Sequence, residues 1–190
     1  MIPFSRTVLL SLMITMLFGC IKSGSEEPYI EYSVGDTGPA GGAIIYDKGE
    51  YSDGWQYLEV APMDASFSAV WGGFGREVSG TEEGIGAGYD NTQLILASMN
   101  EFGVSNTAAQ MCEVLHINGF EDWFIPSKDE LDLIYDYFVN NEKVGAHREW
   151  YWSSTQYNDG SVWSQNFADG SQENYSSKMN RNVVRVLRKL

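Results

Sequence analysis

The sequence predicts one α+β domain made of short antiparallel hairpins and two or three helices. Three observations lead to this fold class. An apolar run at 123–125 leads into a capped amphipathic helix, and an Asn-Asp-Gly turn at 158–160 separates two aromatic, strand-like segments. Glycine-rich, irregular sequence fills 62–90. A chain of 190 residues is long enough for one ordinary domain behind a leader.

The first residues have the composition of an export signal. Arg6 precedes a nearly unbroken apolar run at 8–18, which is too short to span a bilayer and fits a signal peptide. The motif Leu-Phe-Gly-Cys at 17–20 resembles the lipobox of bacterial lipoproteins. This resemblance implies a leader at 1–19 and a lipid such as palmitate on Cys20. An ordinary signal peptide with an accidental cysteine is the alternative.

The lipobox resemblance also implies a place in the cell envelope. Several acyl chains on Cys20 would hold the protein to a membrane, because each buried methylene contributes about 0.8 kcal/mol. Ile21 stands where an aspartate would resemble an inner-membrane retention signal, so an outer-membrane or cell-surface location is expected. Residues 20–33 are then the lipidated cysteine and a flexible tether, and 34–190 form the domain.

The composition limits the partners and the covalent framework. The formal net charge is -14 at pH 7, and such a surface is repelled by phosphate backbones, so no nucleic acid is expected to bind. Cys112 is the only cysteine besides Cys20. With Cys20 lipidated, no intramolecular disulfide is expected, and the fold must depend on its apolar core.

The domain is expected to begin with a hairpin. Gly35–Gly41 holds about two Gly-X-Y triplets, too few for a collagen triple helix, so a glycine-rich turn is expected. Residues 42–47 and 55–61 have the pattern of two strands joined by a turn. The loop at 62–90 lacks the Gly-Lys-Ser/Thr of a phosphate loop, so no nucleotide site is expected.

Two helices are expected between this loop and the apolar run. Capping residues and glycines set their predicted limits: Asp90 or Asn91 to Gly103, and Asn106 or Thr107 to Gly119. Cys112 and His116 lie four residues apart on the second helix and could share a metal ion. Two ligands without a further cysteine or paired histidine make a poor site, so a buried Cys112 thiol and no metal or cofactor are expected.

The stretch Asp122–Leu131 carries the strongest local signal. Ser127 lies three residues before Glu130, which is the spacing of a capping box. Apolar residues then recur on a single helix face, at Leu131, Ile134, Tyr135 and Phe138. A buried extended segment therefore leads directly into a capped helix. This is a folding signal that carries no obvious chemistry.

The rest of the chain is expected to be β. Strands are predicted at 150–155 and 162–167, and alternation places Tyr151 and Trp152 on opposite faces of the first, one in the core and the other available. A second turn at 169–170 leads into a polar segment that ends at Ser177. The run 183–187 is expected to close the chain as one buried strand.

The order of these segments resembles a bacterial family of domains of unknown function, found in lipoproteins and at the C-terminus of collagen-like adhesins. Five segments carry the resemblance: 35–42, 51–59, 122–131, 151–154 and 184–188. It covers about residues 34–190. It implies a C-type-lectin-like fold, related to that of the formylglycine-generating enzymes.

Departures from the related families limit what the resemblance implies. Formylglycine-generating enzymes use a pair of cysteines, and Cys112 stands alone in a predicted helix. The Glu-Pro-Asn, Gln-Pro-Asp and Trp-Asn-Asp motifs of calcium-dependent lectins do not occur. Some collagen-like adhesins bind sulphated polysaccharides, which this acidic domain should repel. The one basic cluster is Arg181, Arg185, Arg188 and Lys189, which alternation would divide between strand faces.

The function expected from these observations is binding or adhesion at the cell surface, with a glycan or a protein as the ligand. Residues 151–182 are rich in Tyr, Trp, Ser, Asn and Gly, as antibody paratopes are. Most of the tryptophans at 55, 123, 152 and 163 are expected to pack in the core. The predicted ligand contacts are Asn158, Asn166, Asp169, Asn174 and Tyr175.

Two other functions stay open at this point. His116 and His147 are the only histidines, and neither has a nucleophile or an orienting carboxylate at a recognisable spacing, so an enzyme is not expected. A structural role in the envelope, without a small ligand, is the main alternative. A cryptic enzyme is the less favoured one.

Overall fold

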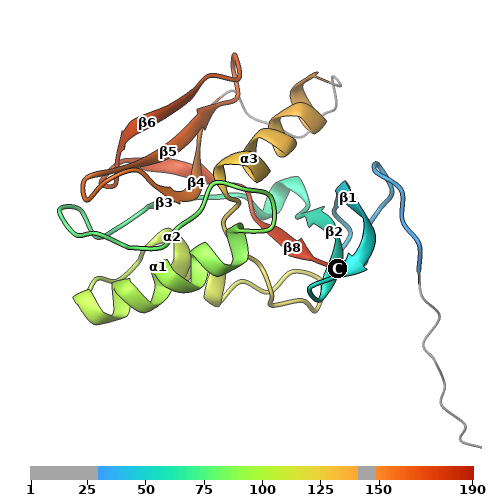
Figure 1. The fold of residues 1–190 in the computed structure, drawn as a ribbon, viewed down its shortest axis with the longest axis horizontal. Helices are drawn as coiled ribbons and strands as arrows, with labels where there is room; N and C mark the ends of the chain where they lie inside the picture. The colour runs from blue at the N-terminus through green and yellow to red at the C-terminus, as the bar shows by residue number, and fades with distance from the viewer. Residues whose placement is uncertain (1–29, 141–148) are drawn as a thin grey trace, which may run out of the picture. The chain divides into compact units, whose positions relative to one another are not determined.

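The computed structural model describes residues 30–140 and 149–190, which form two sheets and three α-helices (Figure 1). The predicted leader at 1–19, the lipid site at Cys20 and most of the tether at 20–33 lie outside these residues and stay predictions. Residues Tyr32–Leu190 form one compact unit. Within the described ranges, no helix has both the length and the apolarity needed to span a bilayer.

The smaller sheet contains the predicted N-terminal hairpin. β1 (Ala43–Ser52) and β2 (Trp55–Val60) pair antiparallel, and β8 (Leu187–Lys189) adds to the other edge of β2. The turn is shorter than predicted, because β1 continues to Ser52. Asp53 and Gly54 alone reverse the chain, both with positive φ, as a tight two-residue hairpin turn requires.

The larger sheet has five strands and mixed pairing. Its order is β3 (Phe67–Val70), β7 (Arg181–Val184), β4 (Trp150–Gln156), β5 (Ser161–Asn166) and β6 (Gln172–Ser177). All neighbours are antiparallel except β4 and β7, which run parallel. The predicted β4–β5 hairpin is confirmed. The two edge strands were not predicted, because β3 lies within the expected loop at 62–90 and β6 is polar.

The predicted last strand at 183–187 is wrong in one respect, because this run forms parts of two strands in different sheets. β7 ends at Val184, β8 begins at Leu187, and Arg185 and Val186 cross between the sheets. Arg185 donates through Nη1 to the Pro62 carbonyl (2.8 Å) and to Ser66 Oγ (3.1 Å). Both halves of the run are buried, so its apolar pattern contains no sign of the break.

The helices follow the predicted order with shifted limits. They are α1 (Gly88–Phe102), α2 (Ala108–Glu113) and α3 (Lys128–Tyr135), the last continued by a π-helical turn at Asp136–Asn140. Gly103 ends α1 in the left-handed conformation, as predicted, but α1 starts before Asp90. Thr107 opens α2 with a capping box. The predicted end of α2 at Gly119 is wrong, because Gly119 lies in a separate tight turn between Ile117 and Phe120.

Two neighbouring residues of β4 show how the layers are arranged. Tyr151 packs in a cluster with Leu131 and Ile134 of α3, while Trp152 packs in another cluster with Ile95 and Met99 of α1. Successive side chains of a strand point to opposite faces, so α3 covers one face of the larger sheet and α1 covers the other (Figure 1). The prediction that one face of this strand is available is therefore wrong. The β4 side chains from 151 to 155 are buried.

Candidate functional site

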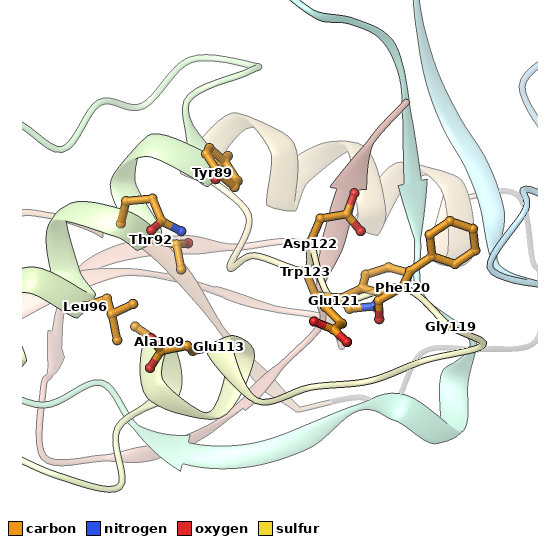
Figure 2. A pocket seen from close by; sticks show the side chains of 11 residues that line it. Tyr89, Thr92, Leu96, Ala109, Glu113, Gly119, Phe120, Glu121, Asp122 and Trp123 are labelled. Atoms are coloured by element: carbon orange, nitrogen blue, oxygen red, sulfur yellow. The ribbon is translucent and has the colours of Figure 1, made fainter.

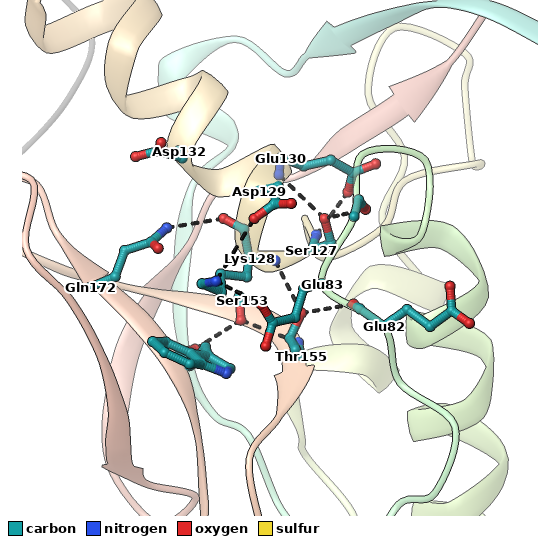
Figure 3. Close-up of polar contacts among 12 residues, drawn as sticks. Glu82, Glu83, Ser127, Lys128, Asp129, Glu130, Asp132, Ser153, Thr155 and Gln172 are labelled. Carbon is teal, nitrogen blue, oxygen red and sulfur yellow. Dashed lines mark hydrogen bonds and ion pairs between the residues drawn. The ribbon is translucent and has the colours of Figure 1, made fainter.

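The N-terminus of α3 is closed by a polar network (Figure 3). Ser127 Oγ accepts from the Glu130 amide (3.2 Å), and Glu130 Oε2 accepts from the Ser127 amide (2.7 Å), so the predicted capping box is confirmed. Glu130 Oε1 also accepts from the Gly86 amide (2.9 Å). The carboxylate is fully buried, and this burial raises the pKa of Glu130 above its ordinary value.

The same network joins α3 to the glycine-rich loop and to β4. The Lys128 amide donates to Thr155 Oγ1 (3.0 Å), which donates to the Glu82 carbonyl (2.9 Å). Lys128 Nζ pairs with Glu83 at 2.6 Å and lies 4.6 Å from the ring centroid of Trp163. These polar groups find their partners inside the domain (Figure 3). The strongest motif of the sequence therefore holds the fold together and leaves no open site.

A pocket of about 550 Å³ opens between α1, α2 and the segment 119–123 (Figure 2). We call it the α1–α2 pocket. Its lining residues are Tyr89, Thr92, Gln93, Leu96, Ala109, Glu113, Gly119, Phe120, Glu121, Asp122 and Trp123. Figure 2 shows them on two facing walls, one from the two helices and one from the segment 119–123. This volume lies within the usual range for small-ligand sites.

The pocket has an apolar floor. Leu96 is half-buried, while Ala109 and Trp123 are buried. Two polar atoms reach this floor, and both have partners inside the fold. Thr92 Oγ1 donates to the Gly88 carbonyl (2.8 Å) and accepts from the Ile125 amide (3.0 Å), and Trp123 Nε1 donates to the Phe120 carbonyl (3.1 Å). The Thr92 hydroxyl and the Trp123 indole N–H therefore already have partners inside the fold.

The rim of the pocket is exposed and acidic. The lining set contains three carboxylates and no lysine, arginine or histidine. Asp122 is held by Arg188 through two hydrogen bonds, Nε to Oδ1 (2.8 Å) and Nη2 to Oδ2 (3.0 Å). Glu121 pairs with His116 Nε2 at 2.7 Å. Glu113 forms no ion pair with any residue in the described ranges, so its charge is uncompensated.

A buried ionic network supports the wall that carries Asp122. Arg188 also donates from Nη1 to Glu59 Oε2 (3.3 Å), and Glu59 is fully buried. The guanidinium lies 3.9 Å from the ring centroid of Phe120, whose side chain points away from the pocket (Figure 2). The partners of Arg188 are thus a buried carboxylate, a rim carboxylate and the rings of Phe120 and, at 5.9 Å, Trp123. Arg185 and Arg188 are both buried, so the predicted basic cluster does not form a basic surface patch.

The same network explains the collagen-like glycine run. Glu59 Oε1 accepts from the amides of Ala40 (3.0 Å) and Gly42 (2.9 Å). A Cβ atom on Gly38 would lie 2.4 Å from Glu59 Cδ, and one on Gly42 would lie 1.9 Å from the Val60 carbonyl oxygen. These two positions have no room for a side chain. The run is therefore a loop wrapped around a buried carboxylate, as the prediction of a glycine-rich turn requires.

A second hollow, of about 410 Å³, lies beside the glycine-rich loop. We call it the Gly72–Met179 groove. Its lining residues are Val70, Gly72, Gly73, Phe74, Arg76, Val104, Lys178 and Met179. Phe74 is 57% exposed and Met179 is 66% exposed. Lys178 is buried and donates to the Arg76 carbonyl (2.7 Å) and Gln156 Oε1 (2.6 Å), and desolvation lowers its pKa to about 8.

The five predicted ligand contacts do not converge. Asn158 Oδ1 accepts from the Gly160 amide (2.9 Å) in the β4–β5 turn. Asn166 and Asp169 accept from the amides of Ala168 (2.9 Å) and Ser171 (3.0 Å) in the β5–β6 turn, at the other end of β5. The remaining two, Asn174 and Tyr175, lie on the edge strand β6, Tyr175 with 74% exposure. None of the five lines the α1–α2 pocket. Their binding role stays a prediction.

The residues of the α1–α2 pocket were not predicted from the sequence. Glu113 and Glu121 resemble ordinary solvated carboxylates in the sequence. They reach one rim only because α2 ends at Glu113 and the turn before Phe120 brings the chain back. The buried Cys112 thiol was predicted correctly, and burial raises its pKa far above the ordinary value. In the described ranges, no group of histidines, cysteines and carboxylates could hold a metal ion.

Comparisons with known proteins place this fold in context. A fimbrial protein from Bacteroides ovatus has a similar structure, with a TM-score of 0.54 and 14% sequence identity over 71% of this chain. The chain spans 36% of that protein's length, and at this identity the likeness is one of fold alone. A search of curated proteins finds no match. The family model of the Lcl C-terminal domain matches residues 64–188, so this chain belongs to the Lcl C-terminal domain family.

Proposed function

We propose that this protein is a lipid-anchored, adhesin-like binding protein of the cell surface, and that its domain takes a ligand in the α1–α2 pocket. The observation that carries the proposal is the pocket itself. Its floor is apolar, its rim is exposed, and the Glu113 carboxylate on that rim has no ion-pair partner among the described residues. Ligand sites are typically concave and apolar, with a few polar groups that set orientation.

Two comparisons support a surface role. The family is described as the C-terminal domain of Lcl, and the similar structure is titled a fimbrial protein. Fimbriae are surface appendages, so an address outside the cell suits a protein of this fold. The lipobox resemblance at 17–20 adds a membrane anchor to the proposal. The C-type-lectin-like character of the domain stays a prediction from resemblance.

The ligand proposed at this level is a glycan or a protein. The net charge of -14 argues against nucleic acid and against direct binding of polyanionic polysaccharides. No enzymatic role is proposed. His116 is hydrogen-bonded to the Val114 carbonyl and paired with Glu121 on the surface, an arrangement without a nucleophile.

The proposal is tested by blocking the pocket. The full-length chain in non-ionic detergent is screened against an array of glycans and surface proteins, and each hit is repeated with Leu96→Trp. The large side chain should fill the pocket and abolish saturable binding. Leu94→Trp is the matched control, because Leu94 lies on the same helix, is 39% exposed and is not a lining residue. Equal binding by both variants contradicts the pocket as the site.

Two companion experiments test the other parts of the proposal. Tyr175→Ala tests the binding role predicted for the polar edge strand β6. If Tyr175→Ala loses ligand binding and Leu96→Trp keeps it, the binding site lies on β6 and not in the α1–α2 pocket. Cys20→Ala should abolish lipid labelling and membrane partition. If the variant keeps both, the lipobox prediction is wrong.

A structural role in the envelope is the second candidate, and the Gly72–Met179 groove favours it. Phe74 and Met179 expose apolar side chains at this groove, which is a feature of surfaces that contact other proteins. The double change Phe74→Ser and Met179→Ser should then weaken association with a partner from the same cell. Array binding through the α1–α2 pocket should not change.

A further inference from the structure

We infer that the α1–α2 pocket binds the side chain of a lysine or arginine residue presented by a polypeptide partner. This inference rests on the proposed function and narrows its ligand to one chemical class. Such a side chain has an apolar stem and a cationic end. The pocket combines the two matching kinds of surface, because its lining holds apolar side chains such as Leu96 together with three exposed carboxylates.

The floor suits an aliphatic stem. Leu96 is half-buried and Tyr89 is 40% exposed, so these two lining residues present carbon surface, and the polar atoms of Thr92 and Trp123 are already hydrogen-bonded within the fold. A ligand that placed hydroxyl groups at this depth would lose their hydrogen bonds to water without replacement. That loss is costly, whereas buried methylene groups gain free energy there.

The charges at the rim select a cation. Asp122 is compensated by Arg188, and Glu121 is compensated by His116 when that imidazole is protonated. Glu113 is left without an ion-pair partner in the described part of the chain, so a bound ammonium or guanidinium group would supply the missing charge. An anionic ligand would meet three carboxylates and no cationic lining residue.

Among the residues that the structure describes, Lys189 also lies close to the pocket without lining it. The Lys189 ammonium is 5.7 Å from the ring centroid of Tyr89 and 5.3 Å from that of Trp55. Burial raises the pKa of Glu130, and the positive charge of Lys189 offsets part of that rise. The face of Tyr89 thus already has a cation nearby, so the selection for positive charge comes from the carboxylates of the rim and from the overall charge of -14.

The test compares two small probes that share the lysine stem and differ at its end, which is a charged ammonium in one and a neutral acetamide in the other. The ¹⁵N-labelled full-length chain in non-ionic detergent is titrated with Nα-acetyl-lysine methylamide and, separately, with the same molecule acetylated on Nε. The charged probe should give saturable shifts of the amides at 89–96, 109–113 and 119–123, and these shifts should weaken at high salt. The neutral probe should give little response. Methyl glucoside serves as the hydroxyl-rich probe.

A matched pair of variants tests the role of the rim. Glu113→Gln should lower the affinity for the lysine probe about two- to fivefold, the range expected for the loss of an exposed ion pair. Glu101→Gln makes the same change of charge on an exposed position of α1 outside the pocket, and should leave the affinity unchanged. Equal effects of the two variants would mean general attraction to an acidic protein, and would overturn the inference.

The remaining outcomes separate this inference from the proposed function. The ligand class is wrong if the lysine probe gives no saturable response, if both lysine probes bind equally, or if only methyl glucoside binds in the pocket. Leu96→Trp would still abolish capture of the array ligand in those cases, and the pocket would keep its role. If Leu96→Trp has no effect on capture, the proposed function fails as well.

Discussion

The N-terminus of α3 and the α1–α2 pocket are both rich in carboxylates, but the fold uses these groups in opposite ways. At α3, Glu130 is buried and accepts two backbone hydrogen bonds from outside its own helix, while Glu83 pairs with Lys128. At the pocket, Glu113 is exposed and forms no ion pair within the described ranges. The comparison teaches that the groups of a conspicuous polar motif can all be paired within the fold, so that none is left to bind a ligand. Unpaired groups beside a cavity are the better candidates for binding.

The largest expected effect comes from Arg188→Leu, which tests how far the pocket wall depends on the buried core. Glu59 would keep its backbone donors but lose its cationic partner, and Asp122 would lose both of its hydrogen bonds. We expect the free energy of unfolding to fall by about 3–5 kcal/mol, because one partner of a buried ion pair is removed. Urea unfolding followed by tryptophan fluorescence measures this change.

Arg181→Leu is the control for that prediction. Arg181 is exposed and donates to the Ser68 carbonyl, so its loss should change stability by less than about 0.5 kcal/mol. Similar effects of the two variants would show that the Arg188 network contributes nothing special to the fold.

Glu130→Ala tests the polar network at the N-terminus of α3 and should have the next largest effect on the free energy of unfolding. The change leaves the amides of Gly86 and Ser127 without their acceptor in a buried setting. We expect a loss of about 2–3 kcal/mol from the unmade hydrogen bonds. Asp129→Ala, at the exposed neighbouring position, should cost much less. Equal losses would contradict the view that the capping carboxylate is a structural group.

The smallest expected effect is a pH dependence at the open rim. The Val114 carbonyl and the Glu121 carboxylate raise the pKa of His116 above its ordinary value. The attraction between protonated His116 and Glu121 is complete below pH of about 6.5 and is lost as pH rises through the raised pKa. Glu121 then carries an uncompensated charge, so a lysine probe should bind more tightly at pH of about 8 than at about 6.

His116→Asn should remove this pH dependence, since asparagine does not titrate. The lysine ammonium stays protonated throughout, because its pKa is about 10.4. The affinity is measured by the same amide titration at both pH values. A wild-type affinity that falls with rising pH, or a dependence that persists in the variant, would show that Glu121 does not contribute to cation binding.

Features that depend on near neighbours in the chain could be predicted. The capping box at Ser127, the opening of α2 at Thr107 and the end of α1 at Gly103 involve residues within a few positions of one another. The two hairpins follow from turn residues between alternating segments. Asn158 and Asp169 were predicted as ligand contacts, but their side chains form the same kind of local hydrogen bond. Their side chains cap their own turns, so a composition like that of a paratope also describes well-made turns.

Features that depend on distant partners could not be predicted. The edge strand β6 is polar and is a strand only because it pairs with β5. The split of the run at 183–187 depends on two sheets that each accept half of it. The pocket wall requires Arg188, Asp122 and Glu59 to meet, although they lie far apart in the sequence.

By itself, the sequence determined the fold class, the helix caps, the hairpin turns and the acidic character of this protein. Those properties arise from composition and from hydrogen bonds between residues close along the chain. Only the tertiary structure decided which carboxylates became buried structural groups and which remained exposed beside a cavity. The physical reason is that desolvation and charge compensation depend on every group that surrounds a side chain in space. For Glu59, Glu113 and Glu130, most of those groups come from distant parts of the sequence.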